Sequence, residues 1–150
     1  DAFVEALRDW GSDVYTMSAG EHDRATAALQ TATHAALIAF GLALDDGTDR
    51  AADLLRFAPP PYRTMLGMVA RLLAATPDVY WDIQASNPYA ADARRRLAEA
   101  LNDLDASVSS GQIEDFERLI ERLDTVVGTA RDRLQEQCQR QFEALVSRDE

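Results

Sequence analysis

The chain has 150 residues, 47% of them hydrophobic, which excludes a disordered protein and allows one domain with a core. Its formal net charge is -11, which excludes nucleic acid as an expected partner. The single cysteine excludes an internal disulfide and fits a reducing cytosol.

The charged residues have an unusual composition. All 15 basic residues are arginine, and aspartate outnumbers glutamate. Such an acidic surface repels itself, and salt screens that repulsion, so the composition is typical of a halophile. The N-terminal part of the chain has no signal-peptide pattern, and we expect a cytoplasmic protein. The weakly polar stretch 25–44 contains a histidine and is interpreted as a buried helix, not a membrane span.

The segment 1–18 differs from the rest of the chain. Its beginning, 1–10, is predicted to form a short helix that Gly11 ends, and the alternating "DVYTM" at 13–17 predicts one short strand. A lone strand cannot form a sheet. We therefore interpret 1–18 as the edge of another domain and 19–150 as a helical domain.

Turn and cap signals divide the remainder of the chain into helices. A helix is predicted over 21–44, ended by the "DDG" at 45–47, and a short helix over 48–57. The "PPP" at 59–61 breaks that helix and opens the next, over 61–75. Thr76-Pro77 pairs a capping residue with a proline at the first helical position and opens a helix to residue 86.

Two long helices are predicted to complete an all-α fold. Asn87-Pro88 repeats the capping signal for a helix to residue 109, and Gly111 separates it from a single long helix over 112–146. Apolar residues of this last helix follow a heptad seam: Ile113, Phe116, Ile120, Leu123, Val127, Ala130 and Leu134. A matching apolar stripe on 88–109 predicts that the two helices pack as an antiparallel pair.

Residues suited to metal or nucleotide chemistry are few. The two histidines of the chain, His22 and His34, both fall within one predicted helix. In a straight helix they lie roughly 18 Å apart and point about 120° away from each other, so they cannot share one metal ion. No GxGxxG or zinc-ligand pattern occurs, so we expect neither a metal nor a cofactor to bind this chain.

Acidic residues are missing from one window. No residue between Asp53 and Asp78 is acidic, although the chain average predicts several there, and Arg71 lies inside this window. Small residues surround this arginine within one helical turn. A buried, unpaired guanidinium is costly, and an incoming carboxylate would satisfy it with two parallel hydrogen bonds. The alternative is a structural salt bridge.

Four further residues are candidates for binding. Gln30 and His34 form a polar pair one turn apart on an alanine-rich face, and His34 is either a pocket residue or a satisfied core histidine. His22 lies in a first helical turn, where a solvated histidine is the ordinary interpretation. Tyr80 belongs either to the core or to a pocket wall, and spacing does not decide between them.

These residues lie in two motifs. "EHDRATAALQTATH" followed by "FAPPPYRTMLGMVARLLAATPDVYWDIQASNP" resembles the C-terminal helical domain of prephenate dehydrogenase. That family has E-H-D, then Q-x-L-x-H, then Y-R…M-V-x-R-L…P-x-L-Y-x-D-I. The resemblance runs from about residue 12 to 146 and is most specific over 21–88.

The resemblance implies a fold and a partner. The family's C-terminal domain is all-helical, resembles that of 6-phosphogluconate dehydrogenase, and forms an intertwined homodimer. An N-terminal Rossmann domain carries NAD or NADP and the catalytic histidine, and the segment 1–18 would be its remnant. The enzyme converts prephenate to 4-hydroxyphenylpyruvate in tyrosine biosynthesis. By this resemblance the chain alone is expected to be inactive, with no catalytic residue of its own.

The resemblance also implies site residues. Arg71 matches the arginine that binds a prephenate carboxylate, His34 the histidine lining the substrate pocket, and His22 the E-H-D histidine near the cleft. Tyr80 matches the aromatic position linked to substrate contact and tyrosine feedback. Ala32 and Ala75 depart from the family pattern and leave open whether the substrate is prephenate or arogenate. The alternative functions are a non-catalytic oligomerisation module or a tyrosine-sensing module.

Overall fold

A computed structural model describes residues 2–45 and 51–146, with no side-chain description for residues 51, 52 and 146. Within these ranges the chain is helical and contains no strand, which confirms the all-α prediction. The helices, in order, are α1 (Ala2–Asp9), α2 (Ala19–Thr26), α3 (Ala32–Ala43), α4 (Ala51–Leu54), α5 (Pro60–Leu73), α6 (Pro77–Ala85), α7 (Ala90–Ser109), α8 (Ile113–Val127) and α9 (Arg131–Val146).

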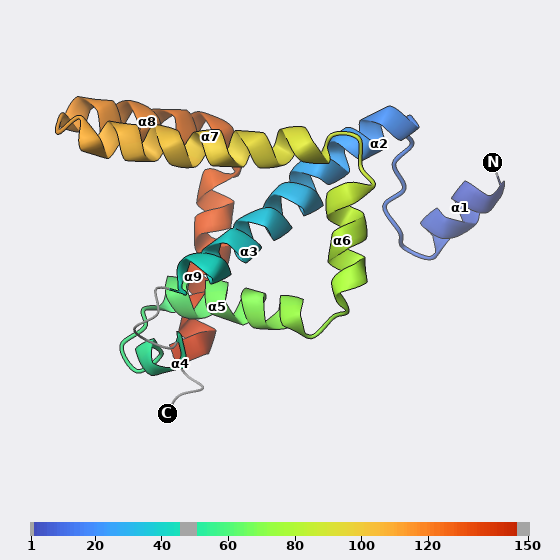
Figure 1. Ribbon diagram of the computed structural model, residues 1–150. Coiled ribbons are helices and arrows are strands. Elements are labelled where there is room, and N and C mark those ends of the chain that lie inside the picture. The colour runs from blue at the N-terminus through green and yellow to red at the C-terminus, as the bar shows by residue number, and fades with distance from the viewer. Residues whose placement is uncertain (1, 46–50, 147–150) are drawn as a thin grey trace.

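The strand expected at 13–17 is wrong. Residues 12–18 have no regular secondary structure and join α1 to α2. A strand needs a neighbour that accepts and donates ladder hydrogen bonds, and none is available to this segment among the described residues. Figure 1 shows α1 standing apart from the remaining helices.

The helix expected over 21–44 forms, with one irregular turn. A π-helical turn at Ala27–Thr31 connects α2 to α3, so the three pieces make one continuous rod through the centre of the molecule (Figure 1). The amide of Ala32 donates to the carbonyl of Ala27, five residues earlier. The apolar periodicity did not reveal this extra residue.

The other predicted helices agree closely with the structure, apart from their ends. The helix expected over 48–57 lies partly outside the described residues, which resume with α4 at Ala51. α6 begins at Pro77 as expected, although the Thr76 hydroxyl makes no capping bond. α7 begins slightly later than expected, at Ala90, because Asn87 Oδ1 accepts from the Tyr89 amide in the preceding turn.

The single long helix expected over 112–146 is broken. α7 and α8 pack as the predicted antiparallel pair, but α9 turns away from α8 and runs towards α5 (Figure 1). The break falls at Gly128, whose φ of 55° and ψ of -139° do not fit a helix. The heptad seam continues across Gly128. A glycine adopts this conformation without strain because it has no side chain.

Substituting Gly128 tests that explanation. Gly128→Ala is expected to lower the free energy of unfolding by about 1–3 kcal/mol, because an alanine at this positive φ is strained. Gly20→Ala is the matched control, since Gly20 lies in α2 with open space around it and no positive φ. Urea unfolding measures both. Equal stability of the two variants would contradict a structural role for the Gly128 conformation.

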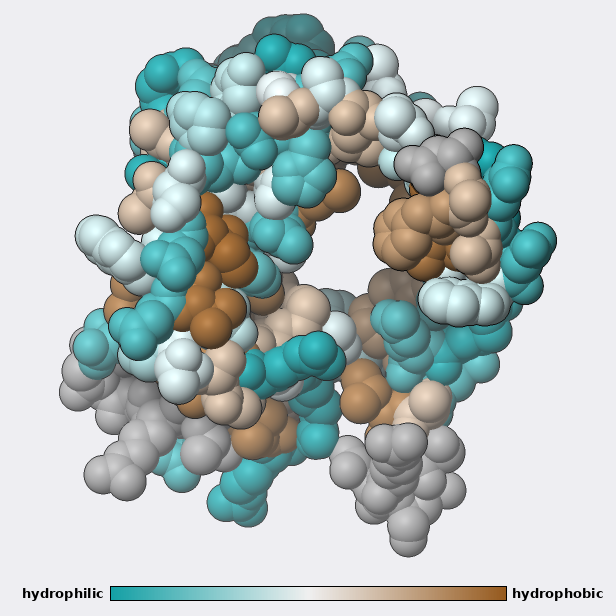
Figure 2. Space-filling model, turned by 90° about the vertical axis from the view of Figure 1, so that its right-hand side faces the viewer, coloured by the Kyte–Doolittle hydropathy of each residue, from teal (hydrophilic) through white to brown (hydrophobic). Residues whose placement is uncertain are grey.

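The single chain has little core. Among the described residues, the buried hydrophobic side chains are Ala27, Leu37, Leu72, Ala90 and Ala93. The chain exposes 11881 Å2, about 4,300 Å2 more than a compact monomer of 16.6 kDa is expected to expose. Figure 2 shows an opening through the molecule with apolar atoms at its edges. This shape leaves apolar helix faces uncovered.

Candidate functional site

Two of the predicted site residues meet between α3 and α6. The rings of His34 and Tyr80 lie 5.1 Å apart, centroid to centroid, at an angle of 87°. This edge-to-face arrangement is a favoured one for aromatic rings. Both side chains are half-buried. His34 Nδ1 is buried and has no hydrogen-bond partner among the described residues.

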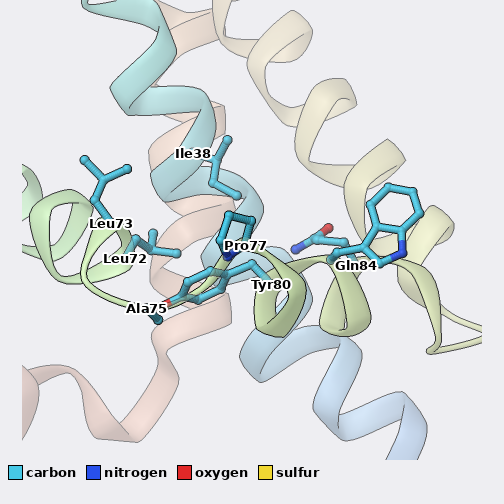
Figure 3. Close-up of a pocket in the computed structure, with 8 residues that line it drawn as sticks. Ile38, Leu72, Leu73, Ala75, Pro77, Tyr80 and Gln84 are labelled. Atoms are coloured by element: carbon cyan, nitrogen blue, oxygen red, sulfur yellow. The ribbon is translucent and has the colours of Figure 1, made fainter.

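A pocket of about 510 Å3 opens next to this pair (Figure 3). The residues that line it come from α3, α5, α6 and the α5–α6 turn: Ile38, Leu72, Leu73, Ala75, Pro77, Tyr80, Trp81 and Gln84. Its wall is mostly apolar, and the lining residues that carry polar side-chain groups are Tyr80, Trp81 and Gln84. A pocket of this kind suits a hydrocarbon ring whose polar substituents are held at the rim.

Arg71 does not have the environment that the sequence predicted. It lies in the last turn of α5 and is exposed in the single chain, so the premise of a buried guanidinium is wrong for this state. The reason is that α5 packs through Leu72 and Val69, whereas Arg71 projects from another side. Its guanidinium has no hydrogen bond or ion pair within residues 2–45 and 51–146. The structural salt bridge is therefore not formed with any described residue.

The π-turn changes how the two histidines face. A turn closed over five residues instead of four inserts one residue into the helix. By ideal helix geometry, this inserted residue changes the angle between His22 and His34 by about 100°, which places the two side chains about 20° apart instead of about 120°. They remain about 16 Å apart along the axis, too far for one metal ion or one single-ring substrate to touch both.

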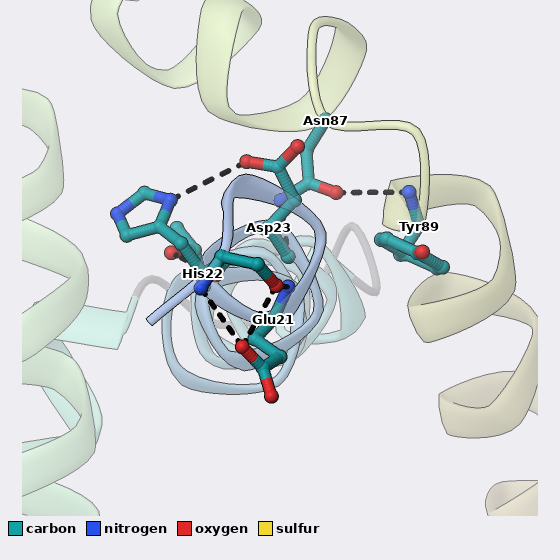
Figure 4. A network of polar contacts seen from close by, with 7 residues as sticks. Glu21, His22, Asp23, Asn87 and Tyr89 are labelled. Carbon is teal, nitrogen blue, oxygen red and sulfur yellow. Dashed lines mark hydrogen bonds and ion pairs between the residues drawn. The ribbon is translucent and has the colours of Figure 1, made fainter. Parts of the chain in front are cut away.

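His22 lies in the polar network that begins the rod (Figure 4). Its side chain is 65% exposed, and Nδ1 lies 3.3 Å from Asp23 Oδ1. Asn87 donates from Nδ2 to the Asp23 carbonyl at 2.7 Å and so ties the α6–α7 turn to α2. Gln30 lies in the π-turn and is exposed; it is not among the residues that line the pocket, and within the described residues it forms no hydrogen bond with His34 Nδ1.

Glu21 has a structural role beyond the E-H-D motif. Ser18 and Glu21 form a capping box: the Glu21 amide donates to Ser18 Oγ, and Glu21 Oε2 accepts from the Ser18 amide at 2.8 Å. The Ser18 amide and the Ser18 hydroxyl both donate to Glu21 Oε2, and these two hydrogen bonds lower the pKa of the Glu21 carboxyl below its usual value. The S-x-x-E spacing at 18–21 was a readable signal for this cap.

The model of one protein family matches most of the chain. It is described as "Prephenate dehydrogenase, dimerization domain", and it matches residues 18–123. This match covers α2 to most of α8, including the pocket, His34, Tyr80 and Arg71.

Three curated relatives extend the comparison. The chain is 44% identical over 144 residues, 96% of its length, to a 4-amino-4-deoxyprephenate dehydrogenase of Streptomyces pristinaespiralis, covering 49% of that protein. It is 31% identical over 84% of its length to a T-protein of Enterobacter agglomerans, covering 34% of it. A probable arogenate/prephenate dehydrogenase of Methanocaldococcus jannaschii is 25% identical over 76% of the chain, which covers 26% of that protein. The chain thus spans half or less of the length of these relatives.

Proposed function

The chain belongs to the prephenate dehydrogenase family, as its dimerization domain, and we propose that it dimerises and binds the substrate of such a dehydrogenase. The observation that supports this best is that one family match contains His34, Tyr80 and Arg71 together with the pocket. The whole enzyme would oxidatively decarboxylate a cyclohexadiene dicarboxylate, with NAD or NADP accepting the hydride.

The nicotinamide cofactor is proposed to bind outside this chain. The glycines never fall into a GxGxxG pattern, and the described residues contain no strand–turn–helix unit that could hold a pyrophosphate. The residues present therefore do not fit a dinucleotide. Hydride transfer would depend on the additional length that the relatives have, and the chain alone would be inactive.

We propose that the substrate is held by its charges at the rim and by its ring in the pocket. Arg71 would bind one carboxylate with two parallel hydrogen bonds, which no described acidic residue competes for. His34 would donate to the ligand from its ring edge, with Tyr80 fixing the ring's orientation. Leu72 and Ile38 would pack against the cyclohexadiene.

His22 and Gln30 are proposed for the outer part of the site. His22 faces the same side as His34 but lies near the start of the rod, so it would face the nucleotide-binding part across the cleft. Gln30, exposed between the two histidines, would contact the ligand's distal polar group only when that part closes over the site.

A second candidate substrate is 4-amino-4-deoxyprephenate. The relative that carries this substrate in its name is 44% identical to the chain, against 31% for the T-protein. The two substrates share both carboxylates and differ in one ring substituent, an amine in place of a hydroxyl. The proposed role of Arg71 is therefore the same for both substrates. Arogenate, in contrast, differs from prephenate in the side chain attached to the ring and not in the ring substituent.

We propose that the uncovered helix faces are buried in a homodimer. Obligate dimers bury roughly 2,000–5,000 Å2 in total over both copies, and the excess exposure of a single chain already reaches that range. The rod over Ala19–Ala43 is long and apolar enough to cross a membrane, with 17% of its apolar window buried in the single chain. A second copy covering this rod accounts for its composition without a membrane, in a cytoplasmic protein.

The proposed function is tested by assaying the proposed whole dehydrogenase, in which this chain is joined to a nucleotide-binding part. Prephenate, arogenate and 4-amino-4-deoxyprephenate are each supplied with NAD+ and with NADP+, and reduced cofactor and CO2 are measured. Turnover of at least one substrate is expected. If none is turned over while the protein is folded and dimeric, the dehydrogenase proposal is contradicted. That result would favour the two alternatives, a non-catalytic oligomerisation module and a tyrosine-sensing module, which family membership does not favour.

A further inference from the structure

A polar cross-link joins the π-turn to the last turn of α6. Thr31 is fully buried, and its hydroxyl donates to the Ile83 carbonyl at 3.1 Å. In return, Gln84 Nε2 donates to the Thr31 carbonyl at 3.0 Å. Two hydrogen bonds in opposite directions fix both the distance and the register of the two helices, because hydrogen bonds are directional.

α7 braces this cross-link from the other side. Arg94 Nη1 donates to the Gln84 carbonyl at 2.6 Å and to Gln84 Oε1 at 3.1 Å. The carbonyls of Ile83 and Gln84 lie in the final turn of α6, where no helix amide remains to donate to them. Thr31 and Arg94 supply these missing donors, so three helices meet in one hydrogen-bonded unit.

The unit lies one helical turn from the His34–Tyr80 contact. On the rod, Thr31 and His34 are spaced i, i+3; on α6, Tyr80 and Gln84 are spaced i, i+4. Residues at these spacings share one face of a helix. The surrounding wall is apolar, and apolar contact is non-directional. The two hydrogen bonds between Thr31 and α6 are therefore what sets the angle and distance of the two rings.

We propose that Thr31, Gln84 and Arg94 form a positioning clamp that orients His34 and Tyr80 for the ligand. That a ligand binds beside these two rings rests on the proposed function, whereas the geometry of the His34 and Tyr80 rings does not. Thr31 is also the last residue of the π-turn. When the clamp is lost, the helix is free to return to regular α geometry, which rotates His34 by about 100° relative to His22.

The first test needs no ligand. Thr31→Val removes the hydroxyl at constant shape, Gln84→Met removes the amide, and Thr31→Ser keeps the hydroxyl. Thr64→Val is the matched control, since the Thr64 hydroxyl donates to Pro60 within one helix, at 3.0 Å. NMR of the His34 imidazole reports the Tyr80 ring current. In Thr31→Val and Gln84→Met the His34 ring shifts are expected to move towards those of free histidine, and in Thr31→Ser and Thr64→Val to stay.

The second test measures binding. Calorimetric titration with 4-hydroxyphenylpyruvate is expected to give roughly threefold to tenfold weaker binding in Thr31→Val and Gln84→Met, with helical circular dichroism retained. Unchanged His34 shifts in both clamp variants overturn the positioning role. An equal change of the His34 ring shifts in the control Thr64→Val overturns it as well. Absence of binding by the unsubstituted protein counts against the proposed function alone, because the NMR result stands without any ligand.

Discussion

Arg71→Ala is expected to lower kcat/KM of the proposed dehydrogenase on the order of 100-fold, mainly by raising KM. Removing one partner of a desolvated, hydrogen-bonded charge pair costs about 2–5 kcal/mol. Arg71 is exposed in the single chain, where an ion pair contributes only about 0.2–1 kcal/mol. The large effect therefore requires that the proposed second copy or the proposed nucleotide-binding part shields the site.

Two controls separate this role from general charge effects. Arg56→Ala removes an equal charge from the same acid-free window, at an exposed side chain whose guanidinium lies 5.9 Å from the Phe57 ring centroid, and should change KM little. Arg71→Lys keeps the charge but not the paired hydrogen bonds, so its KM should fall between those of Arg56→Ala and Arg71→Ala. Steady-state kinetics measures all three. An Arg71→Ala enzyme with normal KM would contradict the carboxylate role.

Leu123→Arg is expected to convert the protein from dimer to monomer at micromolar concentration. Leu123 lies on the heptad seam of α8 and is 52% exposed in the single chain. In a monomer, an arginine at a half-exposed position extends its charge into water at little cost. In a dimer that covers the seam, each copy would bury an unpaired charge, at about 3–5 kcal/mol, and symmetry doubles the loss.

The control lies on the opposite side of the same helix. Thr125 follows Leu123 at i+2 on α8, about 200° around it, and is exposed. Thr125→Arg adds the same charge and should leave the dimer intact. Sedimentation equilibrium gives the mass of each protein. A monomeric unsubstituted chain, or a dimeric Leu123→Arg, would show that this seam is not covered by a second copy.

The helices were predictable because their signals are local. Apolar spacing, Pro77 at a first helical position and the glycine at 111 each act over a short stretch of chain, and the structure places most helix ends close to the predicted ones. The α7–α8 pair was predictable for the same reason, since complementary stripes joined by a short turn pack antiparallel. The break at Gly128 was missed because a glycine is compatible with the heptad pattern and with its interruption.

The sequence by itself determined an all-helical chain, its family, and the residues from which a site could be built. Only the tertiary structure decided which of them meet: His34 and Tyr80 come together, Arg71 lies outside the packed side of α5, and His22 stays near the start of the rod. The physical reason is that a contact between helices depends on rotation about their axes. One inserted residue at Ala27–Thr31 rotates every later side chain by about 100°, and two hydrogen bonds between Thr31 and distant α6 accompany that insertion.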